Sequence, residues 1–544
     1  MYIFLLSATL GLLILDLPFI TYIYGYKSGA IVVGLISMVL LLIKSAPKKK
    51  TIDAEKVSGW VVSDGLDIDN PDMPKQVSVV IDDKAIDLGF LFVGGPGSGK
   101  SIAAIALQQY ITFNRVSGAF AYMEGKGDFD IYKGAVTAGA KPDFFFSSEL
   151  PSSDTINVMA GPTDTVVDYL SRVLVGTESE YYGAAQQAAL RKVIPLLKAF
   201  GKPCNLMDLW ALLTVREASQ YLINKAKNEG FDKDIIIDAE QYFNQDEQDR
   251  LKAIDGLLNK LYPFISGALR ERINAYSPTL DIYSAVANGK RIYFHLPLTQ
   301  TAKAIATMIT ETFGVIAKNR QNDAVNKRDS FPLLFDDWGA FFYDNFGPIT
   351  ARCRSAKMPV SFFFQSRGQT DKVDIGRIFT TEIMDNIGGF CALRINGIDS
   401  AEWVSKQFGT YESQELSATD SSGFDSRSMQ TVDKPRVKPD SLRDMNAGEC
   451  YLSTYAMGAG GAVRAMKYKV RFPMPETKLT PPLDWPKIDG IILNSECDGV
   501  HLWRDFMDKD RLNDIKKQTI ENALSAAKES PEIAEHTIDE GALL

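Results

Sequence analysis

The stretch Leu91-Phe-Val-Gly-Gly-Pro-Gly-Ser-Gly-Lys-Ser101 decides the fold of this 544-residue chain. Its apolar start leads into the spacing Gly94-x-x-x-x-Gly99-Lys100-Ser101, and helix-forming side chains follow from Ile102 to Leu107. A strand, a glycine-rich loop and a helix in this order form a P-loop. Glycines let backbone N–H groups surround an anion, and the helix start adds the positive end of its dipole. The sequence therefore predicts an α/β domain that binds a nucleotide.

Each residue of the loop has an expected role in binding ATP and Mg²⁺. Lys100 is predicted to reach the outer phosphates and to be catalytic, and Ser101 to coordinate Mg²⁺. The backbone of the loop and of the first helical turn is expected to hold the phosphates. The predicted nucleotide-binding residues are Gly94, Gly95, Pro96, Gly97, Ser98, Gly99, Lys100, Ser101 and Ile102.

A second nucleotide motif, Leu333-Leu-Phe-Asp336-Asp337, has the form of a Walker B strand. Asp336 is the predicted Mg²⁺ ligand, and Asp337 is predicted to polarise the attacking water. Another apolar run, Val360 to Phe364, ends at Gln365. Because polar residues at the carboxyl ends of neighbouring strands meet at the ligand crevice, Gln365 is expected to orient the water or to sense the γ-phosphate.

Composition narrows the class of protein. The formal net charge is −9, so any contact with nucleic acid must come from a local patch or a channel. The five cysteines lack C-x-x-C spacing, which indicates neither a disulfide framework nor a zinc site. The three histidines (His295, His501 and His536) are far apart in sequence, so a histidine-based metal site is not expected.

The N-terminus is predicted to be a transmembrane helical hairpin. Met1 to Tyr24 is apolar except for a few residues, a short polar break follows, and Gly29 to Ile43 is apolar again. The lysines from Lys44 to Lys50 then place the large C-terminal part in the cytoplasm by the positive-inside rule. The alternatives are a signal peptide, which lacks its basic start and cleavage site here, and a buried soluble hairpin, which lacks polar faces.

The remaining chain alternates between strand and helix patterns, which predicts a parallel, doubly wound sheet. Helical periodicity without strands predicts an all-helical insertion. The polar stretch Tyr411 to Arg436 is predicted to be a mobile loop, and Glu449 to Phe472 a hairpin. The predicted divisions are 1–50 (membrane hairpin and basic linker), 51–163 (first part of the P-loop domain), 164–280 (helical insertion), 281–485 (second part) and 486–544 (helix and acidic tail).

These motifs, in this order, resemble those of the type IV secretion coupling proteins, the TraG/TraD-like conjugative coupling ATPases. The P-loop follows a membrane hairpin, and Glu124-Gly-Lys-Gly-Asp128 is similar to the family's Asp-Pro-Lys-Gly-Glu element. Asp336-Asp337-Trp338-Gly339 corresponds to the family's Asp-Glu-Phe. Arg354 and Gln365-Ser366 have the spacing of the family's Arg-Gly-Tyr-Gly…Gln-Ser segment. The resemblance covers most of the chain.

The resemblance implies a RecA-like P-loop domain with an all-helical insertion domain, anchored in the bacterial inner membrane by two spans. It implies an ATPase, active as a homo-hexamer, that passes single-stranded DNA with its attached relaxase, or proteins, to a secretion channel and contacts other channel proteins. It also makes Arg354 the catalytic arginine finger, with Arg352 as the fallback. Lys126 is a candidate second cation near the nucleotide.

Two departures from the family pattern keep other functions open. The second Walker B carboxylate is Asp337 rather than glutamate, so hydrolysis is expected to be slow and Asp337→Glu to raise the rate by restoring reach. Ser355-Ala-Lys357 replaces the family's Gly-Tyr-Gly, which weakens the assignment of Arg354. The alternatives are a membrane receptor that uses nucleotide for assembly, and a double-stranded DNA pump of the septal type or a phage-assembly ATPase.

Overall fold

The computed structural model describes residues 59–150, 152–176, 179–267, 269–322, 329–337, 339, 341, 343, 345–369, 382–421, 424–457, 463–475 and 497–507. The chain divides into two compact units, Met1–Ser58 and Gly59–Leu544, and every described residue belongs to the second. The predicted membrane hairpin therefore lies outside the described residues. None of the helices in the described ranges has the length and apolarity that crossing a membrane requires.

An eleven-stranded sheet forms the centre of the second unit, in the order β2-β1-β13-β12-β9-β3-β8-β7-β4-β6-β5. The seven strands from β9 to β5 are parallel, and their apolar residues are buried on both faces, as in α/β proteins. These strands are β3 (Phe90–Val93), β4 (Ala121–Glu124), β5 (Phe144–Ser147), β6 (Ile292–His295), β7 (Leu333–Asp336), β8 (Val360–Phe364) and β9 (Gly389–Ala392).

The predicted parallel sheet is present, and four antiparallel strands extend it at one side. They are β1 (Gly59–Asp67), β2 (Lys75–Asp82), β12 (Glu449–Met457) and β13 (Val463–Arg471). The hairpin predicted within Glu449 to Phe472 is confirmed as β12 and β13. The hairpin of β12 and β13 joins the parallel strands because β12 pairs with β9. The strand β1, which pairs with β2 on its other side, pairs with β13. Strands distant in sequence thus complete one sheet.

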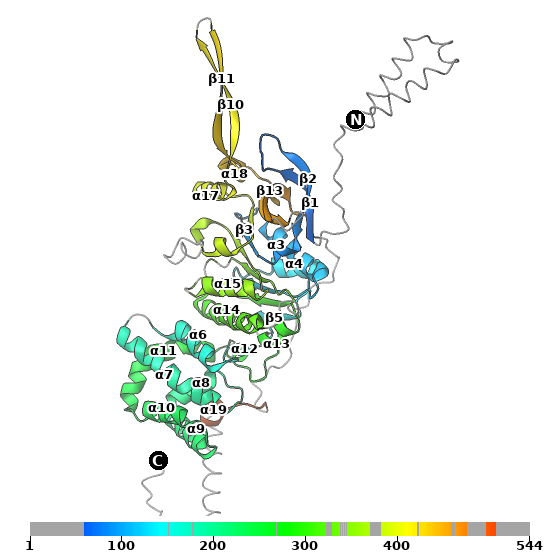
Figure 1. The fold of residues 1–544 in the computed structure, drawn as a ribbon. Coiled ribbons are helices and arrows are strands. Elements are labelled where there is room, and N and C mark those ends of the chain that lie inside the picture. Colours follow the sequence, from blue (N-terminus) through cyan, green and yellow to red (C-terminus); the bar gives the residue numbers. More distant parts are fainter. Residues whose placement is uncertain are drawn as a thin grey trace, which may run out of the picture. The chain divides into compact units, whose positions relative to one another are not determined.

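Two hydrophobic cores lie on opposite faces of the sheet. Successive strand residues alternate between them, so that Phe362 belongs to one core and Phe363 to the other. Helices α4 (Lys100–Asn114) and α5 (Asp130–Thr137) cover one face, while α14 (Gln300–Gln321) and α15 (Phe346–Ser355) cover the other (Figure 1). The strands are therefore sandwiched between helical layers, as the doubly wound pattern predicts.

Between β5 and β6 the chain is almost entirely helical, as the periodicity predicts. Helix α10 buries one face, on which Ile236, Ala239 and Tyr242 lie. Helix α6 packs against α14 and so joins this helical segment to the sheet. The helices are α6 (Thr163–Leu174), α7 (Glu180–Lys198), α8 (Leu206–Thr214), α9 (Arg216–Asn228), α10 (Lys233–Phe243), α11 (Glu247–Ile265), α12 (Leu269–Ile273) and α13 (Ile282–Ala287).

A short C-terminal helix, α19 (Leu502–Met507), packs back onto α8 and α9. The fully buried carboxylate of Asp208 accepts hydrogen bonds from the Trp503 N–H at 3.3 Å and from the Tyr276 hydroxyl at 2.8 Å. Burial raises the pKa of Asp208 to about 6. The helix predicted from Trp503 onward begins here, and its continuation beyond Met507 lies outside the described residues.

The predicted mobile loop from Tyr411 to Arg436 is instead a long hairpin of β10 (Thr410–Ser421) and β11 (Phe424–Pro435), which is a correction to the sequence interpretation. These two strands pair only with each other, and in Figure 1 they extend away from the main sheet. Near its base, Tyr411 and Ser413 donate hydrogen bonds of 2.8 Å to Asp72. Polarity suggested a loop, but Thr, Tyr and Val favour extended backbone when their polar neighbours remain solvated.

Candidate functional site

The loop after β3 has the features that a phosphate site needs. Gly97 and Gly99 adopt φ angles of 68° and 100°, which side chains disfavour. Helix α4 begins at Lys100 with Gly99 as its N-cap and without a side-chain cap, so its N-terminal N–H groups face the loop. The buried Ser98 hydroxyl has no hydrogen-bond partner among the residues that the structure describes. A loop with an uncapped helix start and an unsatisfied hydroxyl fits a phosphate ligand.

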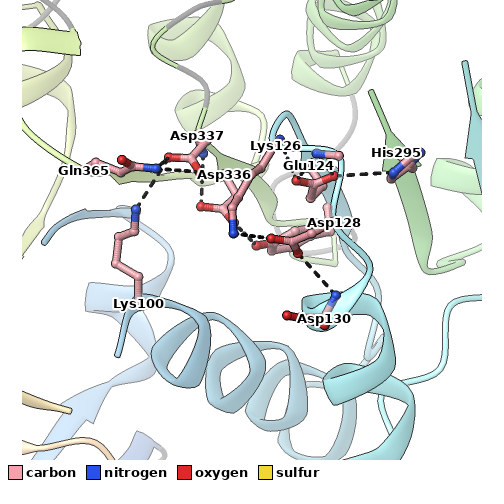
Figure 2. A network of polar contacts seen from close by, with 11 residues as sticks. Lys100, Glu124, Lys126, Asp128, Asp130, His295, Asp336, Asp337 and Gln365 are labelled. Atoms are coloured by element: carbon pink, nitrogen blue, oxygen red, sulfur yellow. Dashed lines mark hydrogen bonds and ion pairs between the residues drawn. The ribbon is translucent and has the colours of Figure 1, made fainter. Parts of the chain in front are cut away.

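Three predicted catalytic side chains meet beside this loop (Figure 2). The Lys100 Nζ lies 3.5 Å from the Asp337 Oδ1, and both side chains are largely buried. The Gln365 Nε2 donates to both oxygens of Asp337, at 3.0 and 3.1 Å. The Asp337 carboxylate therefore contacts both the Lys100 ammonium group and the Gln365 amide. The oxygens of a bound phosphate would compete with this carboxylate for the same two donors.

Sheet register explains why these residues meet. Val93 pairs with Phe364, and Asp336 pairs with Phe363, so β3, β8 and β7 end side by side. The residues that follow each strand, the P-loop, Gln365 and Asp337, must then share one edge of the sheet. The Asp337 N–H also donates to the Phe363 carbonyl at 3.1 Å, which ties the end of β7 to β8.

Asp336 lies one residue deeper than Asp337 and is almost completely buried. Its Oδ1 accepts from the Asp337 N–H at 3.0 Å, and its Oδ2 accepts from the Tyr122 hydroxyl at 3.1 Å. Burial, aided by the charge of Asp337, raises the pKa of Asp336 to about 6. A divalent cation would favour the ionised form of this carboxylate, so the position suits a Mg²⁺ ligand.

Glu124 is a buried residue at the same edge of the sheet. In the sequence it stands out only as part of the motif Glu124-Gly-Lys-Gly-Asp128. It pairs in register with Asp336 on one side and with His295 on the other. Its carboxylate accepts from the N–H groups of Lys126 at 2.5 Å and Gly127 at 2.8 Å, and so it shapes the turn after β4 (Figure 2). Burial raises the pKa of Glu124 to about 8.

The candidate second cation, Lys126, lies on this turn with its side chain mostly exposed. Its ammonium group pairs with Asp128, and this hydrogen bond raises the pKa of Lys126. His295 lies on the other side of Glu124, where its Nδ1 is 2.9 Å from the Ser147 hydroxyl and burial lowers its pKa. The cluster of Glu124, Ser147 and His295 could not be predicted from residue spacing, because its members lie on three strands that are far apart in sequence.

The remaining predicted site residues lie in two places. Ser101 is exposed in the first turn of α4, and Ile102 packs against the core beneath it. Arg352 and Arg354 are exposed in the last turn of α15. Because α15 connects the carboxyl end of β7 to the amino end of the parallel strand β8, Arg354 lies toward the edge of the sheet opposite to Gln365.

The conformation of Asp337 leads to a prediction about its substitution. Its φ of 48° is left-handed, a conformation in which Asp and Asn are enriched and longer side chains cost about 1 kcal/mol more. Asp337→Asn should keep this backbone and ADP binding but lose turnover by about 10² or more, because the carboxylate is removed. Asp337→Glu should also turn over more slowly than the wild type, contrary to the expectation from reach alone.

Both variants are compared by kcat and by ADP affinity on full-length protein. A wild-type kcat for Asp337→Asn would move the water-orienting role to another residue. A kcat above wild type for Asp337→Glu would show that reach outweighs the backbone preference.

Comparison with known proteins supports this architecture. A family model described as the TraM recognition site of TraD and TraG matches residues 335–447. Comparison with curated protein sequences gives no match. The resemblance to type IV secretion coupling proteins that the motifs carry is confirmed by the family match and by solved structures.

Two of these solved structures illustrate the likeness. The unbound bacterial conjugative coupling protein TrwBdeltaN70 is similar with a TM-score of 0.55 and 15% identity, over 80% of this chain and 93% of that chain. The plasmid coupling protein TrwB in complex with ADP and Mg²⁺ is similar with a TM-score of 0.53 and 15% identity, over 80% of this chain and 94% of that chain. This likeness shows a shared mixed α/β P-loop fold.

Proposed function

We propose that this chain is a coupling ATPase of a type IV secretion or conjugation system. One observation carries the proposal: Lys100, Asp337 and Gln365 converge at the ends of three adjacent strands, in a fold shared with TrwB. Convergence of a P-loop lysine, a Walker B carboxylate and a polar strand end is what ATP hydrolysis requires. A nucleotide-independent binding protein would not need this arrangement.

In the proposed reaction the P-loop and Lys100 would bind the β- and γ-phosphates of ATP, and Ser101 with Asp336 would hold Mg²⁺. The metal ion, when bound, neutralises the charge of the phosphate oxygens. Asp337 orients the attacking water, and Gln365 keeps the Asp337 carboxylate in position through its two hydrogen bonds. Arg354 acts on the site of a neighbouring subunit, in keeping with its position at the far edge of the sheet.

The cargo and the assembly are part of the proposal. The similar structures are those of conjugative coupling proteins, and the family model that matches residues 335–447 is described as a TraM recognition site. We propose single-stranded DNA with its relaxase, and proteins, as the cargo that this chain passes to channel components. We propose a homo-hexamer, anchored in the bacterial inner membrane through residues 1–50, with its bulk in the cytoplasm.

The test is ATP hydrolysis by the purified full-length protein in lipid or detergent, with and without DNA. We expect hydrolysis that single-stranded DNA stimulates several-fold, and loss of both in Lys100→Ala. ATP binding without measurable hydrolysis under any of these conditions would instead indicate a receptor that uses nucleotide for assembly. Stronger stimulation by double-stranded than by single-stranded DNA would indicate a pump of the septal type.

A further inference from the structure

The phosphate loop is held from its outer side by residues that lie some three hundred positions later in the chain. The Gly95 N–H donates to the backbone carbonyl of Arg394 at 2.8 Å. The Gly448 N–H donates to the Ser98 carbonyl, also at 2.8 Å. Arg394 follows the end of β9, which neighbours β3, and Gly448 directly precedes β12. The loop is therefore bonded to the two ends of the segment that joins β9 to β12.

The Arg394 side chain adds a second contact to the outside of the loop. Its Nη2 lies 3.5 Å from the Pro96 carbonyl oxygen and 3.4 Å from that of Gly97. Its Nε is buried without a hydrogen-bond partner, and no acidic side chain within the described ranges forms an ion pair with it. Both contacts come from one guanidinium nitrogen, which lies between two adjacent carbonyl oxygens of the loop. The arginine is thus directed at the loop and not at a carboxylate.

The turn Asn446–Glu449 presents Gly448 to the loop. The Glu449 carboxylate accepts from the Asn446 N–H at 3.1 Å and from the Asn446 side-chain amide at 3.2 Å, which keeps the turn closed. Gly448 has a φ of 83°. A Cβ on Gly99 would lie 2.6 Å from the Gly448 nitrogen, so the two backbones are in direct contact. We call Arg394 and the turn Asn446–Glu449 the outer brace.

The outer brace controls which way the peptide groups of the loop point. In a trans peptide the C=O and the following N–H point in opposite directions. Holding the carbonyls of Pro96 and Ser98 outward therefore turns the N–H groups of Gly97 and Gly99 toward the inner side of the loop. Inward N–H groups are what bind an anion in such a loop. The brace thus prepares the loop for phosphate before any ligand arrives.

We infer that Arg394 and the turn Asn446–Glu449 are positioning residues for the phosphates of a nucleoside di- or triphosphate. They act through the loop backbone, so they determine nucleotide affinity and leave the chemical step to Lys100 and Asp337. The inference rests on the proposed function only in taking the ligand of the loop to be a nucleotide.

The experiment measures ADP·Mg²⁺ affinity, and KM and kcat for ATP, on full-length variants. Arg394→Ala should weaken ADP binding and raise KM about tenfold, the loss of one charge-assisted contact, with kcat within about twofold of wild type. Arg394→Lys keeps the charge but not the planar guanidinium, so it should recover part of the affinity. Glu449→Ala opens the turn and should weaken ADP binding by a few-fold. The matched control is Arg443→Ala, an exposed arginine of α18 (Pro439–Arg443), which should leave both quantities unchanged.

The outcomes separate this inference from the proposed function. Wild-type ADP affinity in Arg394→Ala and Glu449→Ala would overturn the inference while leaving the ATPase proposal intact. A fall in kcat at unchanged KM would also overturn it, because Arg394 would then act on the reacting atoms. If either variant lowers the melting temperature of the nucleotide-free protein without changing its ADP affinity, the outer brace stabilises the fold and does not position the loop for phosphate. That result would also overturn the inference. Absence of nucleotide binding in the wild type would end both proposals.

Discussion

Lys100→Ala abolishes ATP turnover, with an expected loss of about 10³ or more in kcat. The side chain starts from the first residue of α4, lies 3.5 Å from Asp337 and is largely shielded from solvent. Removing its ammonium group leaves the phosphate charge without the cation around which the site is built, and positioning with charge neutralisation is most of the catalysis in this class of reaction. The loss should appear in kcat, whereas the outer brace should affect KM.

The measurement is steady-state hydrolysis by the full-length protein, together with its melting temperature to show that the variant is folded. Lys133→Ala is the matched control, because Lys133 is an exposed lysine of α5, the next helix along the chain. We expect the control to hydrolyse ATP at the wild-type rate. Wild-type turnover by Lys100→Ala would contradict the assignment of the P-loop.

Arg354→Ala should be almost as inactive as Lys100→Ala, and mixing the two proteins should restore part of the activity. An arginine finger supplied to a neighbouring site contributes about 10³ or more to kcat. Arg354 lies in the last turn of α15, exposed, at the edge of the sheet opposite to Gln365. In mixed rings some interfaces combine an intact Lys100 with an intact Arg354, and these interfaces should hydrolyse ATP.

Arg352→Ala, measured alone, distinguishes the two arginines of this helix turn. If Arg354→Ala is active and Arg352→Ala is not, the finger is Arg352. If mixed rings form and no activity returns, neither arginine completes the site of a neighbour. Ring formation is checked by mass before activity is compared, so that failed mixing is not read as a failed finger.

Local motifs predicted the parts of the site that are contiguous in sequence. The P-loop, the Walker B strand and the strand ending at Gln365 could be identified because a few adjacent residues determine each of them. Their meeting point followed from a general property of parallel sheets. What the sequence could not provide was the register, which brings Glu124 between Asp336 and His295.

The missed features depend on contacts between distant parts of the chain. Arg394 and Gly448 reach the P-loop because β9 and β12 are neighbours in the sheet, and no local pattern records that pairing. The hairpin of β10 and β11 was predicted as a loop because its residues are polar. Its two strands are joined by backbone hydrogen bonds, which form whether or not one face of the hairpin is apolar. The left-handed backbone conformation of Asp337 likewise cannot be predicted from the spacing of residues in the sequence.

The outer brace has a thermodynamic consequence for the hairpin of β10 and β11. This hairpin lies within the segment that begins at Arg394 and ends at Gly448, and both ends are hydrogen-bonded to the phosphate loop. Binding equilibria that share a structure are reciprocal. A partner that binds the hairpin more tightly when nucleotide is present must therefore raise the affinity for nucleotide by the same factor. Nucleotide affinity measured with and without such a partner would report the coupling between the two sites.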